Sequence, residues 1–70
     1  MRDINRLDAF YENLKAIHKN YIPDWRFGQF ILNFMEWYVA KYRRDLFYVE
    51  EDKMALLLRE FIDDLGIKHI

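Results

Sequence analysis

The segment from Trp25 to Arg43 constrains the fold more than any other, because it is apolar around nearly its whole helical circumference. A helix with so narrow a polar stripe is normally covered by neighbours on most sides. In a chain of 70 residues, two other short helices can cover only part of such a surface. The pattern therefore predicts a central helix whose excess apolar surface meets a second copy of the chain. The apolar positions are Phe27, Phe30, Ile31, Leu32, Phe34, Met35, Trp37, Tyr38, Val39, Ala40 and Tyr42.

A helix before this segment is predicted over residues 5–21, where apolar residues recur at steps of three and four. Asn5 is a suitable N-cap for it. Pro23 ends it, because the residue before a proline is pushed out of the helical conformation. Asp24 is then placed to cap the central helix.

A third helix is predicted over residues 50–65 by the same periodicity. Gly66 follows it, where glycine readily takes the left-handed conformation that ends a helix. His69 and Ile70 are expected to fray. The whole chain, residues 1–70, is therefore expected to be a single all-α domain, a compact three-helix unit with an aromatic-rich central helix that associates as a helical dimer.

Composition limits the function classes open to this chain. It has 13 aromatic residues but no cysteine, so disulfides and thiolate metal sites are excluded, and a cytoplasmic location is indicated. The net charge of −1 argues against a strongly basic nucleic-acid binder. No secretory signal follows Met1, and no apolar run is long enough to span a membrane. We expect no cofactor.

Thirteen aromatic side chains are more than so small a domain can bury, so some are expected on a contact surface. Tryptophan and tyrosine are enriched at the energetic centres of protein interfaces. Gly28, inside the central helix, predicts a close crossing with another helix, because an interior glycine otherwise costs stability. The aromatic interface candidates are Trp25, Trp37, Tyr42, Phe47 and Tyr48.

The narrow polar stripe of the central helix supplies three further interface candidates, Arg26, Gln29 and Asn33. The two amides, four residues apart, either form a structural hydrogen-bonded pair or contact a partner. Arg26 is expected to reach the acidic cluster at residues 50–52 and to tie the central helix to the third. Adjacent helical positions point about 100° apart, so these acids suit a dipole-favoured helix start better than a metal site.

Catalytic chemistry has no clear candidates in this sequence. The chain contains no serine, threonine or cysteine, so the common nucleophiles are absent and His18 lacks a group to activate. Lys41, Arg43 and Arg44 form a short basic patch that suits either a helix C-terminus or phosphate contact. We therefore predict no catalytic, cofactor-binding or metal-binding residues.

Three motifs between residues 2 and 52 resemble a family of short bacterial and phage proteins that has no established activity, and the resemblance extends over nearly the whole chain. More distantly, the Pro-Asp segment and its helix are similar to the YihD-type proteins. The resemblance implies importance for the polar stripe, the acidic cluster and the Phe47–Tyr48 pair, in folding or in binding. The motifs are Arg2-Asp3-x-x-Arg6-Leu7-Asp8, then Pro23-Asp24-x-Arg26-x-Gly28-Gln29-x-Ile31-x-Asn33, and Asp45-x-Phe47-Tyr48-x-Glu50-Glu51-Asp52.

These observations favour a non-enzymatic protein-interaction or accessory module, homodimeric or bound to another protein. The alternative hypothesis is a nucleic-acid-associated regulator, whose binding would weaken steeply with added salt.

Overall fold

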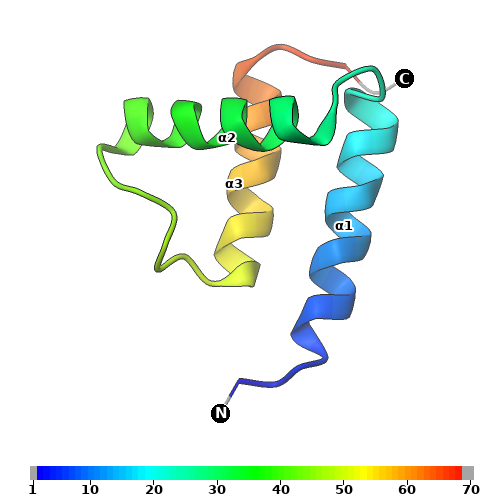
Figure 1. The fold of residues 1–70 in the computed structure, drawn as a ribbon, viewed down its shortest axis with the longest axis vertical. Helices are drawn as coiled ribbons and strands as arrows, with labels where there is room; N and C mark the ends of the chain where they lie inside the picture. Colours follow the sequence, from blue (N-terminus) through cyan, green and yellow to red (C-terminus); the bar gives the residue numbers. More distant parts are fainter. Residues whose placement is uncertain (1, 69–70) are drawn as a thin grey trace.

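The computed structural model describes residues 2–68, and within them the chain forms three α-helices and no strand. α1 and α3 run side by side in the same direction, and α2 lies across their upper ends (Figure 1). This arrangement confirms the predicted compact, all-α, three-helix unit, whereas His69 and Ile70 lie outside the described residues. The helices are α1 (Arg6–Tyr21), α2 (Phe27–Tyr42) and α3 (Glu51–Asp64).

The start of α2 differs from the prediction. Asp24 does not cap it; the N-cap position belongs to Arg26, whose backbone is extended. The intervening residues form a turn in which the N–H of Trp25 donates to the carbonyl of Ile22 at 3.1 Å. The turn lets the Trp25 ring reach Phe61, with ring centroids 6.3 Å apart. Packing of the indole thus decides where α2 begins.

The other predicted helix ends need smaller corrections. Asn5 holds the N-cap position of α1, but its side chain makes no capping hydrogen bond. Instead, the carboxylate of Asp3 accepts a hydrogen bond from the N–H of Asn5 at 2.9 Å. α3 is one residue shorter at each end than the predicted range of 50–65.

The end of α3 has the predicted glycine cap. Gly66 has φ +69°, a left-handed conformation that costs glycine nothing sterically. Its N–H donates to the carbonyl of Asp63 at 3.0 Å, and the N–H of Ile67 donates to the carbonyl of Ile62 at 3.3 Å. These two bonds define a Schellman motif, and Ile67 packs against the core as such a motif favours.

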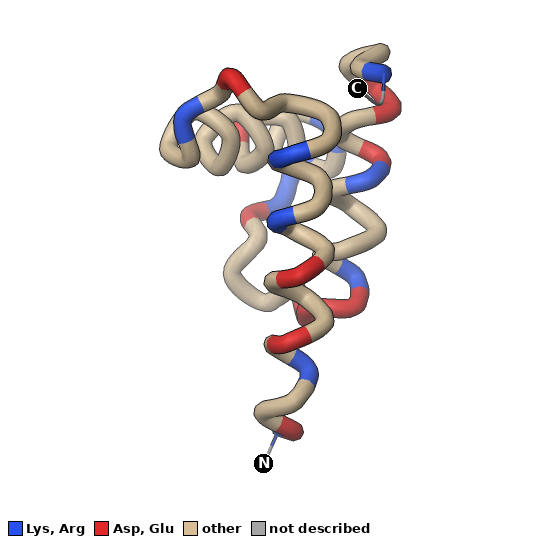
Figure 2. The backbone as a smooth tube through the Cα atoms, turned by 90° about the vertical axis from the view of Figure 1, so that its right-hand side faces the viewer, with Lys and Arg blue, Asp and Glu red and all other residues tan. Residues whose placement is uncertain are grey.

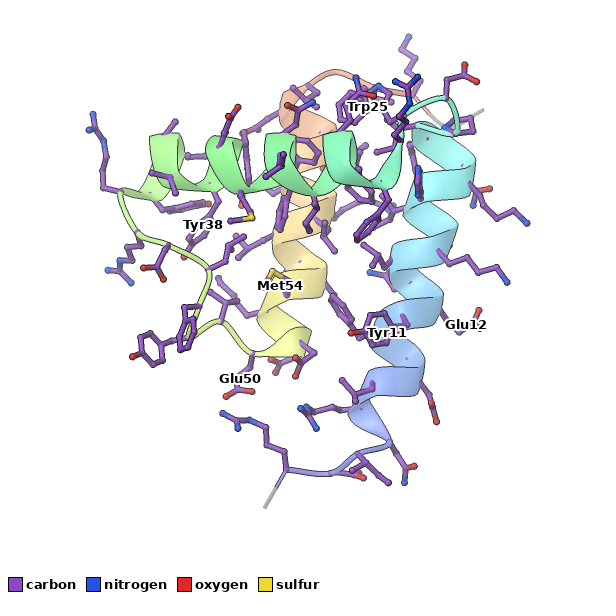
Figure 3. All side chains as sticks on the ribbon, viewed as in Figure 1. Tyr11, Glu12, Trp25, Tyr38, Glu50 and Met54 are labelled. Carbon is purple, nitrogen blue, oxygen red and sulfur yellow. The ribbon has the colours of Figure 1, made fainter. Side chains whose placement is uncertain are left out.

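Phe61 of α3 is the centre of an aromatic core. Its ring centroid lies 5.5 Å from that of Phe34, 5.6 Å from Trp37 and 6.4 Å from Phe30. Edge-to-face and offset pairs of this kind add stability beyond the burial of area. Figure 3 shows side chains filling the space between α2 and the other two helices, with Tyr38 pointing from α2 into it. The buried residues are Ile17, Ile22, Phe30, Phe34, Tyr38, Leu57, Leu58, Phe61 and Ile62.

α2 is buried on one side only, which confirms the prediction that the two other helices cover only part of its apolar surface. Phe30, Phe34 and Tyr38 recur every four residues and face the core. α2 lies across α3 rather than along it (Figure 1), so its neighbours reach a single face. Figure 2 shows α2 standing to one side of the other two helices, with few charged residues on it.

Candidate functional site

The outer face of α2 carries an apolar strip that no other part of the described chain covers. Leu32, Met35 and Val39 are 59%, 43% and 47% exposed. Together with Gly28 they are spaced by four, three and four residues, which places them on one side of a helix. We call these four residues the outward stripe. A contiguous exposed apolar patch usually marks a contact surface.

Gly28 lies in the outward stripe and not at a crossing within the chain. A Cβ atom built there would meet no atom within 4 Å. The predicted close crossing is therefore wrong for the single chain, because α1 and α3 both lie on the opposite side of α2. The glycine instead leaves the backbone open at the start of the stripe.

A polar edge borders the outward stripe along one side. It consists of Arg26, Gln29, Asn33 and Glu36, all exposed except the half-buried Asn33. Within residues 2–68 none of these side chains makes a hydrogen bond or ion pair. Of the two alternatives left open for Gln29 and Asn33, the structural hydrogen-bonded pair is therefore absent within these residues. The predicted link from Arg26 to the acidic cluster is wrong.

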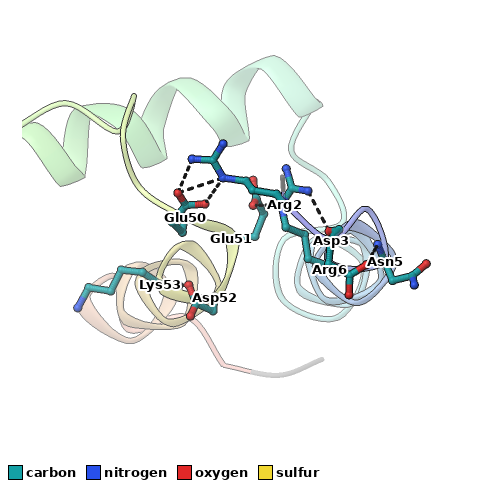
Figure 4. A network of polar contacts seen from close by, with 8 residues as sticks. All are labelled: Arg2, Asp3, Asn5, Arg6, Glu50, Glu51, Asp52 and Lys53. Atoms are coloured by element: carbon teal, nitrogen blue, oxygen red, sulfur yellow. Dashed lines mark hydrogen bonds and ion pairs between the residues drawn. The ribbon is translucent and has the colours of Figure 1, made fainter.

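The acidic cluster is paired with the N-terminal segment instead (Figure 4). Arg2 Nη2 lies 2.6 Å from Glu50 Oε1, and Arg6 Nε lies 2.7 Å from Glu51 Oε1. Hydrogen bonds from Arg2 lower the pKa of the Glu50 carboxyl. These contacts join the beginning of α1 to the beginning of α3, so the expected salt bridge exists with a different partner. Among residues 2–68, no cluster of acids or histidines is placed to hold a metal ion.

A second polar cluster joins the end of α2 to the end of α3. Lys41 Nζ lies 2.7 Å from both Glu60 Oε2 and Asp64 Oδ2. Its hydrogen bonds lower the pKa of both carboxyls, and the pKa of the lysine is raised. Lys41 therefore does not belong to a free basic patch, and only Arg43 and Arg44 remain from that prediction. The signal in the sequence was the four-residue spacing of the two acids, which places them on one face of α3.

Two of the predicted interface aromatics, Trp25 and Trp37, pack against the core, and a third, Tyr42, lies against Trp37. Trp25 is half-buried at the junction of α1 and α2 (Figure 3). Trp37 is half-buried, and its indole N–H donates to Asp64 at 2.9 Å. Tyr42 is more exposed and donates its hydroxyl to Glu60. Contacts within the chain thus account for much of the surface of these three rings.

Phe47 and Tyr48, in the connection between α2 and α3, are 82% and 87% exposed. Their ring centroids lie 4.8 Å apart, edge to face. They border an open hollow with Arg2 and Glu50. The pair is separate from the outward stripe, because the connection runs down from the end of α2 towards the start of α3 (Figure 1).

His18 has a structural contact. Its Nε2 donates to the carbonyl of Trp25 at 2.7 Å, since a carbonyl can only accept. The ring packs against Phe30 with centroids 5.2 Å apart. His18 thus ties the last turn of α1 to the turn that precedes α2.

Of the predicted site residues, the structure gathers only Arg26, Gln29 and Asn33 beside the outward stripe. The residues that sequence reasoning missed are Leu32, Met35 and Val39. Their signal was present as apolar positions outside the buried row of Phe30, Phe34 and Tyr38, but periodicity alone does not show which face a neighbour covers.

No family model, curated protein or solved structure matches this chain, so the resemblance described above stays a prediction. No helix among residues 2–68 is long and apolar enough to cross a membrane.

Proposed function

We propose that the protein is a non-enzymatic protein-interaction module that self-associates through the outward stripe of α2. The observation that carries the proposal is the exposure of Leu32, Met35 and Val39 on one helical face. Burying a leucine, valine or methionine side chain is worth about 1.5–3 kcal/mol. Because these three side chains are about half exposed, covering them would contribute about half of that value each, about 2–4 kcal/mol in total, which a partner would supply.

Chain size supports a second copy as the partner. A domain of about 60 residues buries only about 60% of the surface of its unfolded chain, so it is marginally stable alone. Association of two copies stabilises the folded state by mass action. The lack of serine, threonine and cysteine supports an accessory role without catalysis, and the lack of cysteine is compatible with the cytoplasm.

Concentration-dependent association of the purified chain tests the proposal. Sedimentation velocity over the micromolar range should show a dimer, and Leu32→Lys should convert it to a folded monomer. Leu56→Lys is the matched control, because Leu56 on α3 is also strongly exposed but lies outside the outward stripe. A wild-type chain that stays monomeric throughout, or equal effects of the two lysine variants, would contradict the proposal.

The alternative, a nucleic-acid-associated regulator, draws on Arg43 and Arg44, which are both exposed at the end of α2. It has weaker support, because Lys41 is already paired with two carboxylates. A mobility-shift assay at low salt with DNA and RNA distinguishes the two proposals, since phosphate binding should weaken steeply as salt is added.

A further inference from the structure

The polar edge of α2 becomes complementary in charge to itself when it is reversed in direction. We infer from this that two copies pair through antiparallel α2 helices, about a two-fold axis at the level of Ile31. This inference rests on the proposed self-association. Arg26 and Glu36 each lie five residues from Ile31, whereas Gln29 and Asn33 each lie two residues from it. Along the chain the edge therefore presents a cation, an amide, an amide and an anion at symmetric spacing.

Antiparallel pairing follows from the signs of these charges. A two-fold axis perpendicular to both helices keeps the polar edge of one copy beside the polar edge of the other, reversed in direction. Arg26 then faces Glu36 of the second copy, and Gln29 faces Asn33 of the second copy, each pair twice. Parallel helices about a two-fold axis would place the two polar edges on opposite flanks of the contact, so Arg26 and Glu36 would gain no partner from the second copy.

The charges are free to make these contacts. Arg26 and Glu36 are both exposed, and within the described chain neither side chain has an ion-pair partner. By contrast, Lys41, the other charged residue of α2, is held by two carboxylates of α3. The two unpaired charges are thus the two that the symmetric arrangement would match.

The same axis matches apolar residues with one another. Phe27 and Met35 each lie four residues from Ile31, and both are exposed, so the axis brings them to the same level of the two helices. Gly28, with open space around its Cβ position, allows the two backbones to approach closely near the axis.

Charge reversal tests the pairing directly. Arg26→Glu alone should weaken self-association, because two attractive contacts become repulsive, and Glu36→Arg alone should do the same. Each exposed pair contributes modestly, so we expect the dissociation constant to rise about 10-fold or more in each variant. The two variants mixed together should form a heterodimer of near wild-type affinity, because both contacts are again between opposite charges. The double variant should also recover.

Glu12→Arg is the matched control, since Glu12 is an exposed acid on α1 that undergoes the same change of charge. Circular dichroism of each variant verifies the fold. A wild-type dimer that survives both reversals, or two weakened variants that do not recover on mixing, would overturn this pairing and leave self-association standing. A wild-type chain that never dimerises would overturn the proposed function together with it.

Discussion

Replacing Gly28 with alanine is expected to stabilise the folded monomer. Gly28 is helical with negative φ, the second residue of α2. Glycine has the poorest helix propensity of any residue except proline, because it loses the most backbone freedom on folding. Apart from the adjacent residues and the backbone of α2 itself, no atom lies within 4 Å of the position that the new methyl group would take, so the substitution brings no clash.

The size of the gain follows from these observations. Glycine costs about 1 kcal/mol relative to alanine in a helix interior. A residue in the first turn shows part of that difference, so we expect about 0.5–1 kcal/mol. For a domain of this size, each kcal/mol moves Tm by about 4–8 °C, so Tm should rise by about 2–8 °C.

Thermal unfolding followed by far-ultraviolet circular dichroism measures this shift, at a concentration low enough for the chain to be monomeric. Gly28→Leu should give a similar rise, because leucine is also a good helix former. At higher concentration, however, the leucine variant should dimerise less tightly, since the added side chain separates the two α2 helices. A lower Tm for Gly28→Ala would refute the reasoning, because it would show that another helix occupies this position.

Two further predictions concern the contacts between α2 and α3. The pKa values of Glu60 and Asp64 are lower in the folded chain than in the unfolded chain. The two ionised carboxylates therefore stabilise the folded state above the unfolded pKa, and this contribution is lost as pH falls through the folded pKa values. The urea midpoint of the wild-type chain should therefore decrease as pH is lowered from about 6 to about 2, and the midpoint of Lys41→Met should decrease less. The same pH dependence in both proteins would contradict this prediction. Phe61→Ala should cost about 3–5 kcal/mol, comparable to the whole stability of so small a domain. Far-ultraviolet circular dichroism should show a largely unfolded chain, and an unchanged midpoint would count against a core centred on Phe61.

The helices could be predicted from sequence because their apolar residues recur at helical spacing, and Gly66 marked the end of α3. The start of α2 could not be predicted from sequence, because the indole of Trp25 packs on Phe61 and holds the preceding residues in a turn. This contact joins residues 36 positions apart, and local propensity contains no information about it.

The candidate site was only partly predictable, because it too depends on how distant parts of the chain pack together. Periodicity identified α2 as apolar on most sides, but the crossing direction of α2 over α3 decides which side stays in water. Arg26 was assigned to the acidic cluster because charge alone permits it. In the structure, Arg2 and Arg6 occupy that cluster because α1 runs beside α3.

The positions of the two tryptophans make their intrinsic fluorescence a probe of the packing between α2 and α3. Trp25 and Trp37 both pack on Phe61, with ring centroids 6.3 Å and 5.6 Å away, and neither belongs to the outward stripe. Their emission should shift when α2 separates from α3 and stay nearly constant when two copies meet through α2. Intrinsic fluorescence therefore follows unfolding, whereas a label attached beside Val39 would follow association, so the two equilibria can be measured separately in one sample.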